Sequence, residues 1–252
     1  MTVLLIRANR NDIDAQHLAA LGISSRVDPY LRISSVKNIA GAMRMLSELD
    51  DAKKSTARPT WLAITSTNAL SYFDDLLPEH ELDRIFDKNS NVKFAAIGNQ
   101  TSSQLIARGA TEVLQPVNAN SESLADLMCK GTAGTVVIPS GSIAMETLAN
   151  RLADSGFKIV SEVVYETSFV SESPVSVDEV RDGMFDAVLL RSPSAARAFE
   201  QFNPNASVKV ICAGEATAIQ AQKLGLNVAA VSAGPDPQLV AQTIAKVIGS
   251  QK

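Results

Sequence analysis

Cysteine and histidine are scarce in this chain of 252 residues, which holds two of each. Their positions, Cys129, Cys212, His17 and His80, show none of the spacings that are typical of zinc ligands. We therefore expect no metal site made of these residues and no cofactor chemistry that depends on a cysteine cluster. Cys129 lies in a predicted helix and Cys212 in a predicted strand, so we expect two buried thiols rather than a disulfide.

Long apolar runs and an excess of basic residues are also missing. No segment approaches the roughly 18 consecutive apolar residues of a membrane helix, and the first apolar stretch is too short for a secretory signal. The 23 Lys and Arg residues against 27 Asp and Glu residues give a net charge of −4, which argues against a broad basic surface for nucleic acid. We expect a cytoplasmic protein that binds neither membranes nor nucleic acids.

Three familiar motifs are absent as well. The patterns GxGxxG and Walker A do not occur, which argues against classical dinucleotide and P-loop nucleotide binding. GxSxG does not occur either, and neither histidine has a serine or cysteine partner in view. We interpret both histidines as surface residues.

Short apolar runs rich in Val, Ile and Leu alternate with segments of helical spacing. Continuous runs are typical of strands buried on both faces of a parallel sheet, and their alternation with helices indicates an α/β architecture. Ser142 and Gly156 are the predicted N-cap and C-cap residues of one helix. Residues 50–59 and 170–174 interrupt the alternation, and the second stretch looks like a crossing or linker. The predicted strands are residues 3–6, 61–64, 92–98, 135–139, 158–165, 186–190, 208–214 and 227–231.

Two segments of the chain align with two later segments. In these alignments Ser66 corresponds to Ser192, and Thr101 corresponds to Thr217. Any two strand–helix units share apolar residues and a glycine, but such units do not explain the shared hydroxyl positions. We interpret the chain as internally duplicated, and the order of the modules is compatible with two contiguous halves or with one split half. The aligned segments are 60–73 with 186–199 and 92–109 with 208–225.

Hydroxyl side chains and glycines follow the predicted strands where the helices begin. Ligands of parallel sheets bind beyond the carboxyl ends of the strands, and helix N–H groups beside Ser and Thr hydroxyls bind anions without a basic side chain. Taken singly, each Ser, Thr or Asn is better explained as a helix cap, but their repetition in both halves of the chain favours a role in ligand binding. Arg7 follows the first strand and either clamps a carboxylate or phosphate or is a surface cation. The candidate binding residues are Arg7, Thr65, Ser66, Asn68, Gly98, Thr101, Pro139, Ser140, Gly141, Ser192, Ser194, Gly214 and Thr217.

Six short motifs are spread over nearly the whole chain. They are Thr-Ser-X-Asn-Ala at 65–69, Ile97-Gly98-X-X-Thr101, Ser121-Glu122-X-Leu124, the predicted loop Pro139-X-Gly141, Val164-Tyr165-X-Thr167 and Ala213-Gly214-X-X-Thr217-Ala218. In their order and spacing these motifs resemble the uroporphyrinogen-III synthase family. The family's first strand usually ends in Thr-Arg-Pro, whereas this chain has Ile6-Arg7-Ala8, so the arginine matches and the proline does not.

The resemblance implies two similar three-layer α/β domains with parallel sheets, joined by a two-stranded linker. One domain would be discontinuous, with residues 1–33 and 171–252, and residues 34–168 would form the other, with linkers near 31–35 and 167–174. The resemblance also implies a hydro-lyase of tetrapyrrole (heme) biosynthesis. Such an enzyme cyclises the linear tetrapyrrole hydroxymethylbilane to uroporphyrinogen III, with inversion of ring D, loss of water and no cofactor or metal.

The resemblance further assigns roles to single residues. Tyr165 matches the tyrosine proposed to assist departure of the substrate hydroxyl. Thr101 and Thr217 match threonines near the substrate carboxylates, and two serines, Ser66 and Ser192, match serines at the substrate cleft. The backbone at Gly98, Pro139–Gly141 and Gly214 would donate N–H groups to carboxylates.

Two alternatives stay open. Without the resemblance, Tyr165 is equally a strand-end aromatic residue that covers the sheet. A non-catalytic, two-domain cytosolic protein that binds a small molecule is the second functional hypothesis. We expect a monomer in either case.

Overall fold

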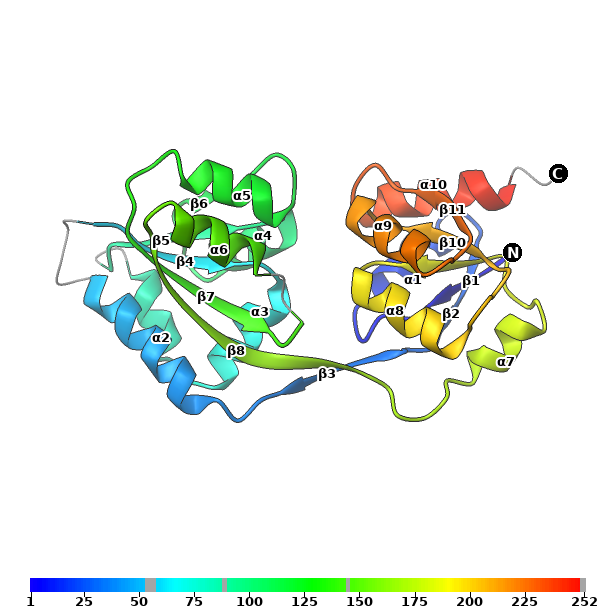
Figure 1. The fold of residues 1–252 in the computed structure, drawn as a ribbon, viewed down its shortest axis with the longest axis horizontal. Helices are drawn as coiled ribbons and strands as arrows, with labels where there is room; N and C mark the ends of the chain where they lie inside the picture. Colours follow the sequence, from blue (N-terminus) through cyan, green and yellow to red (C-terminus); the bar gives the residue numbers. More distant parts are fainter. Residues whose placement is uncertain (53–57, 88–89, 144–145, 250–252) are drawn as a thin grey trace. The chain divides into compact units, whose positions relative to one another are not determined.

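The computed structural model describes residues 1–52, 58–87, 90–143 and 146–249. Strands and helices alternate along this part of the chain (Figure 1), which confirms the predicted α/β architecture. The chain divides into two compact units. Unit 1 is Met1–Ile33 with Ser168–Lys252, and unit 2 is Ser34–Thr167.

The sheet of unit 1 has the strand order β11-β10-β9-β1-β2, and each of its pairings is parallel. Its strands are β1 (Thr2–Leu5), β2 (Ser24–Val27), β9 (Ala187–Leu190), β10 (Lys209–Cys212) and β11 (Val228–Val231). Its helices are α1 (Asn11–Ala19), α7 (Ser176–Arg181), α8 (Pro193–Phe202), α9 (Glu215–Lys223) and α10 (Pro237–Gly249).

Both faces of this sheet are covered. Successive side chains of a strand point to opposite faces, and β1 shows the consequence. Val3 and Leu5 pack in one cluster with α1 and α10, whereas Leu4 packs in another cluster with α7, α8 and α9. Burial on both faces explains why the strand is a continuous apolar run, and it makes unit 1 a three-layer structure.

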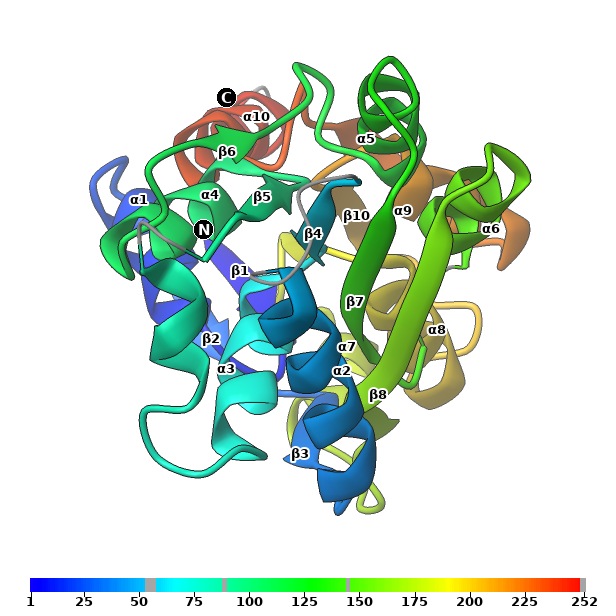
Figure 2. The ribbon, with the colours of Figure 1, turned by 90° about the vertical axis from the view of Figure 1, so that its left-hand side faces the viewer.

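The sheet of unit 2 has the order β3-β8-β7-β4-β5-β6, and its pairings from β8 to β6 are parallel. In Figure 2, β7 and β8 lie side by side. The strands are β3 (Leu31–Ser35), β4 (Thr60–Ile64), β5 (Val92–Ala96), β6 (Val113–Leu114), β7 (Thr135–Gly141) and β8 (Lys158–Phe169). The helices are α2 (Ile39–Asp51), α3 (Thr67–Asp75), the 3-10 helix η2 (Leu82–Phe86), α4 (Asn99–Ala107), α5 (Ser121–Met128) and α6 (Thr147–Asp154).

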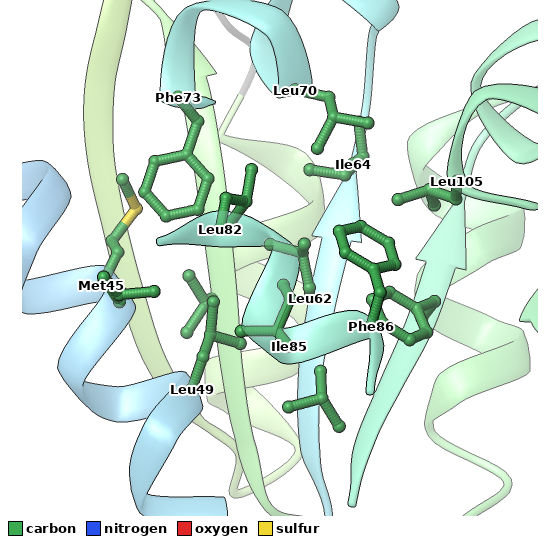
Figure 3. Packing of buried hydrophobic residues seen from close by; sticks show 14 of the residues in the cluster. Met45, Leu49, Leu62, Ile64, Leu70, Phe73, Leu82, Ile85, Phe86 and Leu105 are labelled. Carbon is green, nitrogen blue, oxygen red and sulfur yellow. The ribbon is translucent and has the colours of Figure 1, made fainter. Parts of the chain in front are cut away.

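One face of this sheet packs against α2, α3 and η2. Met45 and Leu49 lie four residues apart on the inner face of α2 and meet Phe73 and Leu62 in a fully buried cluster (Figure 3). Each such side chain contributes about 1.5–3 kcal/mol through burial. A separate cluster joins the other face to α5 and α6, so unit 2 is also a three-layer structure.

The two sheets share one strand order. In unit 1, β9 lies between β10 and β1, and in unit 2, β4 lies between β5 and β7. The aligned segments 60–73 and 186–199 are β4-α3 and β9-α8, and the other aligned pair is β5-α4 and β10-α9. The segments that the sequence pairs therefore occupy equivalent positions, as a duplication requires.

The predicted loop Pro139-Ser140-Gly141 is wrong. These residues continue β7, where Pro139 lies opposite Glu162 of β8 and Gly141 opposite Tyr165. The pairing of β4 with β7 reaches only Val137. Pro139 therefore lies where β7 is paired with β8 alone, and there a missing N–H is tolerated.

The predicted cap at Ser142 is also wrong. Helix α6 begins at Thr147 with Glu146 as its N-cap, and the Ser142 hydroxyl instead accepts a hydrogen bond from the Thr167 N–H over 3.2 Å. The predicted C-cap glycine is confirmed, because Gly156 follows the helix with a φ of 85°.

Cys129 and Cys212 are both free thiols. Cys212 is buried in β10, where desolvation raises its pKa to about 11. Cys129 is exposed after the last turn of α5, which corrects the prediction of a buried thiol.

The two predicted interruptions have different outcomes. Residues 170–174 follow the end of β8, outside any helix or strand, whereas part of 50–59, residues 53–57, lies outside the described residues. Within the described part of the chain, no helix combines the length and the apolar character that crossing a membrane requires.

Candidate functional site

The predicted site residues fall into two groups, one in each unit. In unit 2 the loops after β4 and β5 lead directly into α3 and α4. Ser66 is the N-cap of α3, and its Oγ accepts a hydrogen bond from the Ala69 N–H over 3.2 Å. Gly98 is the extended N-cap of α4, and Thr101 is 5% exposed in the first turn of that helix. Both helix N-termini present backbone N–H groups that have no partner within the helix.

Tyr165 of β8 lies beside the first of these helix starts. Its hydroxyl oxygen is 3.2 Å from the Ser66 Oγ, and either atom is able to donate the hydrogen bond. Its ring stacks on that of Tyr72 in α3, with centroids 5.6 Å apart and an angle of 26° between the planes. Tyr165 is partly exposed as a residue, and its contact with Ser66 is partly buried.

Gly141 makes room for this ring. A Cβ atom at position 141 would lie 2.5 Å from the Tyr165 Cζ and 2.8 Å from its hydroxyl oxygen. Atoms cannot approach so closely, so any side chain at position 141 would displace the phenol. Three elements therefore hold Tyr165 in place: β7 through Gly141, α3 through Ser66 and Tyr72, and its own strand β8.

The remaining predicted residues of unit 2 are less directly placed for ligand contact. The Ser140 Oγ donates a hydrogen bond to the Glu162 carbonyl oxygen over 3.2 Å, so β8 occupies this hydroxyl. Pro139 is buried within β7. Thr65 and Asn68, in the loop after β4 and in the first turn of α3, are partly buried.

Unit 1 repeats the two helix starts. Ser192 is the N-cap of α8, and its Oγ accepts a hydrogen bond from the Ala195 N–H over 3.1 Å. The Ser194 Oγ lies 2.9 Å from the Ser192 Oγ. Gly214 is the extended N-cap of α9, and Thr217 is 4% exposed in its first turn.

Charged residues accompany these hydroxyls in unit 1. Arg191, directly after β9, forms a two-pronged ion pair with Asp14 of α1: its Nε donates to Asp14 Oδ2 over 2.9 Å and its Nη2 donates to Asp14 Oδ1. Arg7, which follows β1, has its Nη1 3.5 Å from the same Asp14 Oδ2. Burial lowers the pKa of Arg7, and the nearby Arg191 adds to this effect while Asp14 opposes it.

The sequence analysis missed Asp14 and Arg191. One signal was available for Arg191, because it aligns with Thr65 of the other repeat and is a basic residue directly after a fully buried strand. Asp14 gave no comparable signal, since an acidic residue in the first turn of a helix is common. Among the described residues, no three His, Cys, Asp or Glu side chains gather as metal ligands.

Known proteins match the chain both in sequence and in structure. A sequence model of the family described as uroporphyrinogen-III synthase HemD matches residues 14–241. A mutant uroporphyrinogen III synthase from the extremely thermophilic bacterium Thermus thermophilus is similar in structure over 100% of both chains, with a TM-score of 0.66 and 15% sequence identity. The uroporphyrinogen-III synthetase of Helicobacter pylori 26695 is similar over 96% of both chains, with a TM-score of 0.60 and 16% identity. At these identities the two structures show a shared fold.

Proposed function

Because the chain belongs to the uroporphyrinogen-III synthase family and so acts in tetrapyrrole biosynthesis as a cyclising enzyme, we propose that it is the hydro-lyase that converts hydroxymethylbilane into uroporphyrinogen III. In this reaction the hydroxymethyl C–O bond breaks and water leaves. A pyrrole nitrogen supplies the electrons, which produces a reactive azafulvene. The substituted carbon of ring D, rather than the free one, attacks the azafulvene, and its old bond to the methylene bridge of the neighbouring ring then breaks. That bridge bonds instead to the free carbon of ring D, which loses its proton, so that ring D ends inverted.

The reaction requires little covalent chemistry from the side chains of the protein. The leaving hydroxyl needs a proton donor, and the chain ends of the substrate need to be held in one geometry, which lowers the entropic part of the barrier. A proton returns to the donor when ring D loses its own proton and the pyrrole regains aromaticity. No side chain has to act as a nucleophile.

Tyr165 is the proposed proton donor. The observation that supports the proposal is that neighbouring residues fix the position of its phenol group. The residue is partly exposed, and the 3.2 Å contact of its hydroxyl with the Ser66 Oγ keeps that group oriented. A serine hydroxyl both donates and accepts, so Ser66 is able to donate to the phenolic oxygen while the phenol gives its proton to the substrate. The Tyr72 stack and the space at Gly141 restrict the ring to this position.

The helix starts are the proposed binding groups for the substrate carboxylates. At Gly98 and Gly214 an added Cβ would meet no described atom closer than 3.9 Å. Both residues have extended φ angles, −135° and −177°, that any residue adopts. Neither the surrounding fold nor the backbone angle therefore requires glycine at these two positions. A ligand that lies close against the backbone would explain the glycines, because a side chain would keep it away. The proposed binding residues at the helix starts are Thr65, Ser66, Asn68, Gly98, Thr101, Ser192, Ser194, Gly214 and Thr217. Binding by Pro139, Ser140 and Gly141 of β7 stays a prediction from the sequence.

We also infer that the two units act as two domains joined by a two-stranded linker. The division of the chain at Ile33/Ser34 and Thr167/Ser168 supports this inference. Strands β3 and β8, which contain these two points, are hydrogen-bonded neighbours. The cytoplasmic location and the monomeric state stay predictions from the sequence.

The test is to give the purified protein hydroxymethylbilane and to resolve the isomers of the product by chromatography. We expect isomer III in excess over the spontaneous product, isomer I. Formation of isomer I alone would overturn the proposed function. If the protein then still bound uroporphyrinogen III, that result would favour the non-catalytic binding protein instead.

A further inference from the structure

Arg7 and Arg191 of unit 1 follow two neighbouring strands, β1 and β9. Between these strands the chain connections change direction across the sheet. Strands β1 and β9 are parallel neighbours, but β1 leads to β2 on one side and β9 leads to β10 on the other. In open parallel sheets, ligands bind beyond the carboxyl ends of the two strands at such a point. Arg7 and Arg191 are the basic residues that follow these strand ends.

All three guanidinium nitrogens of Arg191 donate hydrogen bonds to protein oxygens. Its side chain is 9% exposed, and it pairs through two nitrogens with Asp14, whose side chain is 2% exposed. Its third nitrogen, Nη1, donates to the Pro235 carbonyl oxygen over 2.5 Å. A buried charge is tolerated only with such pairing. Arg191 therefore ties α1 to the loop before α10, and it occupies both oxygens of Asp14.

Arg7 is held differently. Its contact with Asp14 is 3.5 Å long, which is beyond a good hydrogen bond, and its side chain is 27% exposed. The causes of its lowered pKa, burial and the neighbouring Arg191 and Arg10, outweigh the attraction of Asp14. Arg7 and Arg191 thus both lie beside the Asp14 carboxylate, and only Arg191 pairs with it closely. The positive charge of Arg7 is incompletely balanced within reach of solvent.

We propose that Arg7 binds a carboxylate of the ligand at this point of unit 1, and that Arg191 is a positioning residue that keeps Asp14 from neutralising Arg7. The ligand class is a small molecule with carboxylate groups. Its identity as the linear tetrapyrrole rests on the function proposed above. A guanidinium group is suited to this role because its fork of N–H donors matches a carboxylate.

Four variants test the proposal: Arg7→Gln, Arg191→Gln, the double variant Arg191→Gln/Asp14→Asn and the control Arg26→Gln. Arg26 is a half-exposed arginine of the same unit that pairs with Glu179, so its loss changes the net charge equally. The readouts are KM and kcat for hydroxymethylbilane, and the melting-temperature shift produced by citrate against sodium chloride at the same ionic strength. Citrate serves as a carboxylate probe that does not depend on catalysis.

We expect Arg7→Gln to raise KM by roughly 10- to 100-fold, the range of a charge-assisted hydrogen bond, and to remove the citrate shift while Arg26→Gln retains it. If Arg7→Gln and Arg26→Gln give the same KM and the same citrate shift, the proposed carboxylate site is overturned. If wild-type protein makes only isomer I but its citrate shift disappears in Arg7→Gln, the proposed function fails and the carboxylate site stands.

The double variant separates positioning from plain support of the fold. Arg191→Gln alone frees Asp14 to pair with Arg7 and should weaken citrate binding. Removing the carboxylate as well, in Arg191→Gln/Asp14→Asn, should restore binding, and it also avoids an unpaired buried charge. If the double variant folds but binds citrate no better than Arg191→Gln, or if Arg191→Gln binds like the wild type, the positioning role is overturned.

Discussion

The two units start their helices in the same way and differ in what lies next to those starts. Ser66 and Ser192 cap α3 and α8 through equivalent bonds of 3.2 and 3.1 Å to the N–H groups of Ala69 and Ala195. Gly98 and Gly214 begin α4 and α9 with extended backbones. The two serines are the caps that helix N-termini favour, whereas the two glycines are shared although neither space nor backbone angle requires them.

The neighbouring positions have diverged. Where unit 2 has Thr65 after its central strand, unit 1 has Arg191. The hydroxyl of Ser66 meets a phenol from β8, whereas that of Ser192 meets Ser194 within its own helix. Unit 2 therefore offers a neutral proton donor, and unit 1 offers positive charge. A repeated scaffold keeps its caps and varies the residues beside them.

The largest expected effect is on the phenol of unit 2. Tyr165→Phe should lower kcat for isomer III by about 10²- to 10⁴-fold, the range for loss of a positioned proton donor, with little change in the melting temperature. The measurement is the initial rate of isomer III formation. Tyr72→Phe, which keeps the stacked ring, is the matched control and should stay near the wild-type rate. An unchanged rate in Tyr165→Phe would remove this residue from catalysis.

A second change moves the phenol without deleting it. In Gly141→Ala the new methyl group takes the place of the Tyr165 ring, so we expect a rate loss approaching that of Tyr165→Phe. Overpacking should also destabilise the protein by about 1–3 kcal/mol. Urea unfolding and the isomer III rate measure the two effects. A wild-type rate here would show that the observed position of the phenol is not the active one.

A third pair of substitutions tests whether the glycines at the starts of α4 and α9 serve substrate binding. Gly214→Ala in unit 1 and Gly98→Ala in unit 2 meet no steric obstacle among the described residues. The free energy of unfolding should change by less than about 1 kcal/mol, because the restriction of the unfolded chain by alanine opposes the preference of an N-cap for glycine over alanine. If the substrate approaches these backbones, KM should nevertheless rise. Thermal unfolding and steady-state kinetics measure the two effects, and an unaltered KM in both variants would contradict close approach of the substrate to these backbones.

The smallest expected effect compares the two caps directly. Ser66→Ala and Ser192→Ala should each cost about 1 kcal/mol of stability through loss of a helix N-cap. Only Ser66→Ala should also reduce kcat, because its hydroxyl contacts Tyr165. Chemical denaturation and steady-state kinetics on the pair test this asymmetry. Equal losses of kcat would mean that the two helix starts contribute alike.

Much of the fold was predictable because the central strands are buried on both faces. Strands β4 and β9 appear in the sequence as continuous apolar runs and lie within one or two residues of their predicted bounds. Strand β2 was missed because its four residues are mostly exposed and carry little apolar signal. Strand β6 was missed because it has two residues. Both lie at sheet edges, where burial is weakest.

The candidate site was predictable only in part. Helix-start serines and glycines follow from local chemistry, since an N-cap needs a short polar side chain and the residue stands directly before its helix. The predicted loop at Pro139–Gly141 failed because the length of β7 depends on β8, a partner more than twenty residues later, and not on its own sequence. The cap at Ser142 failed for the same reason, because its hydroxyl is taken by Thr167.

The sequence by itself determined the alternation of strands and helices, the repeated helix starts and the left-handed glycine after α6, because each depends on residues that are neighbours in the chain. Only the tertiary structure decided which side chains meet. Tyr165 reaches Ser66 across 99 residues, and Arg191 reaches Asp14 across 177. Those meetings depend on the order of strands in each sheet, which results from the packing of both faces and is not encoded in any single stretch of sequence.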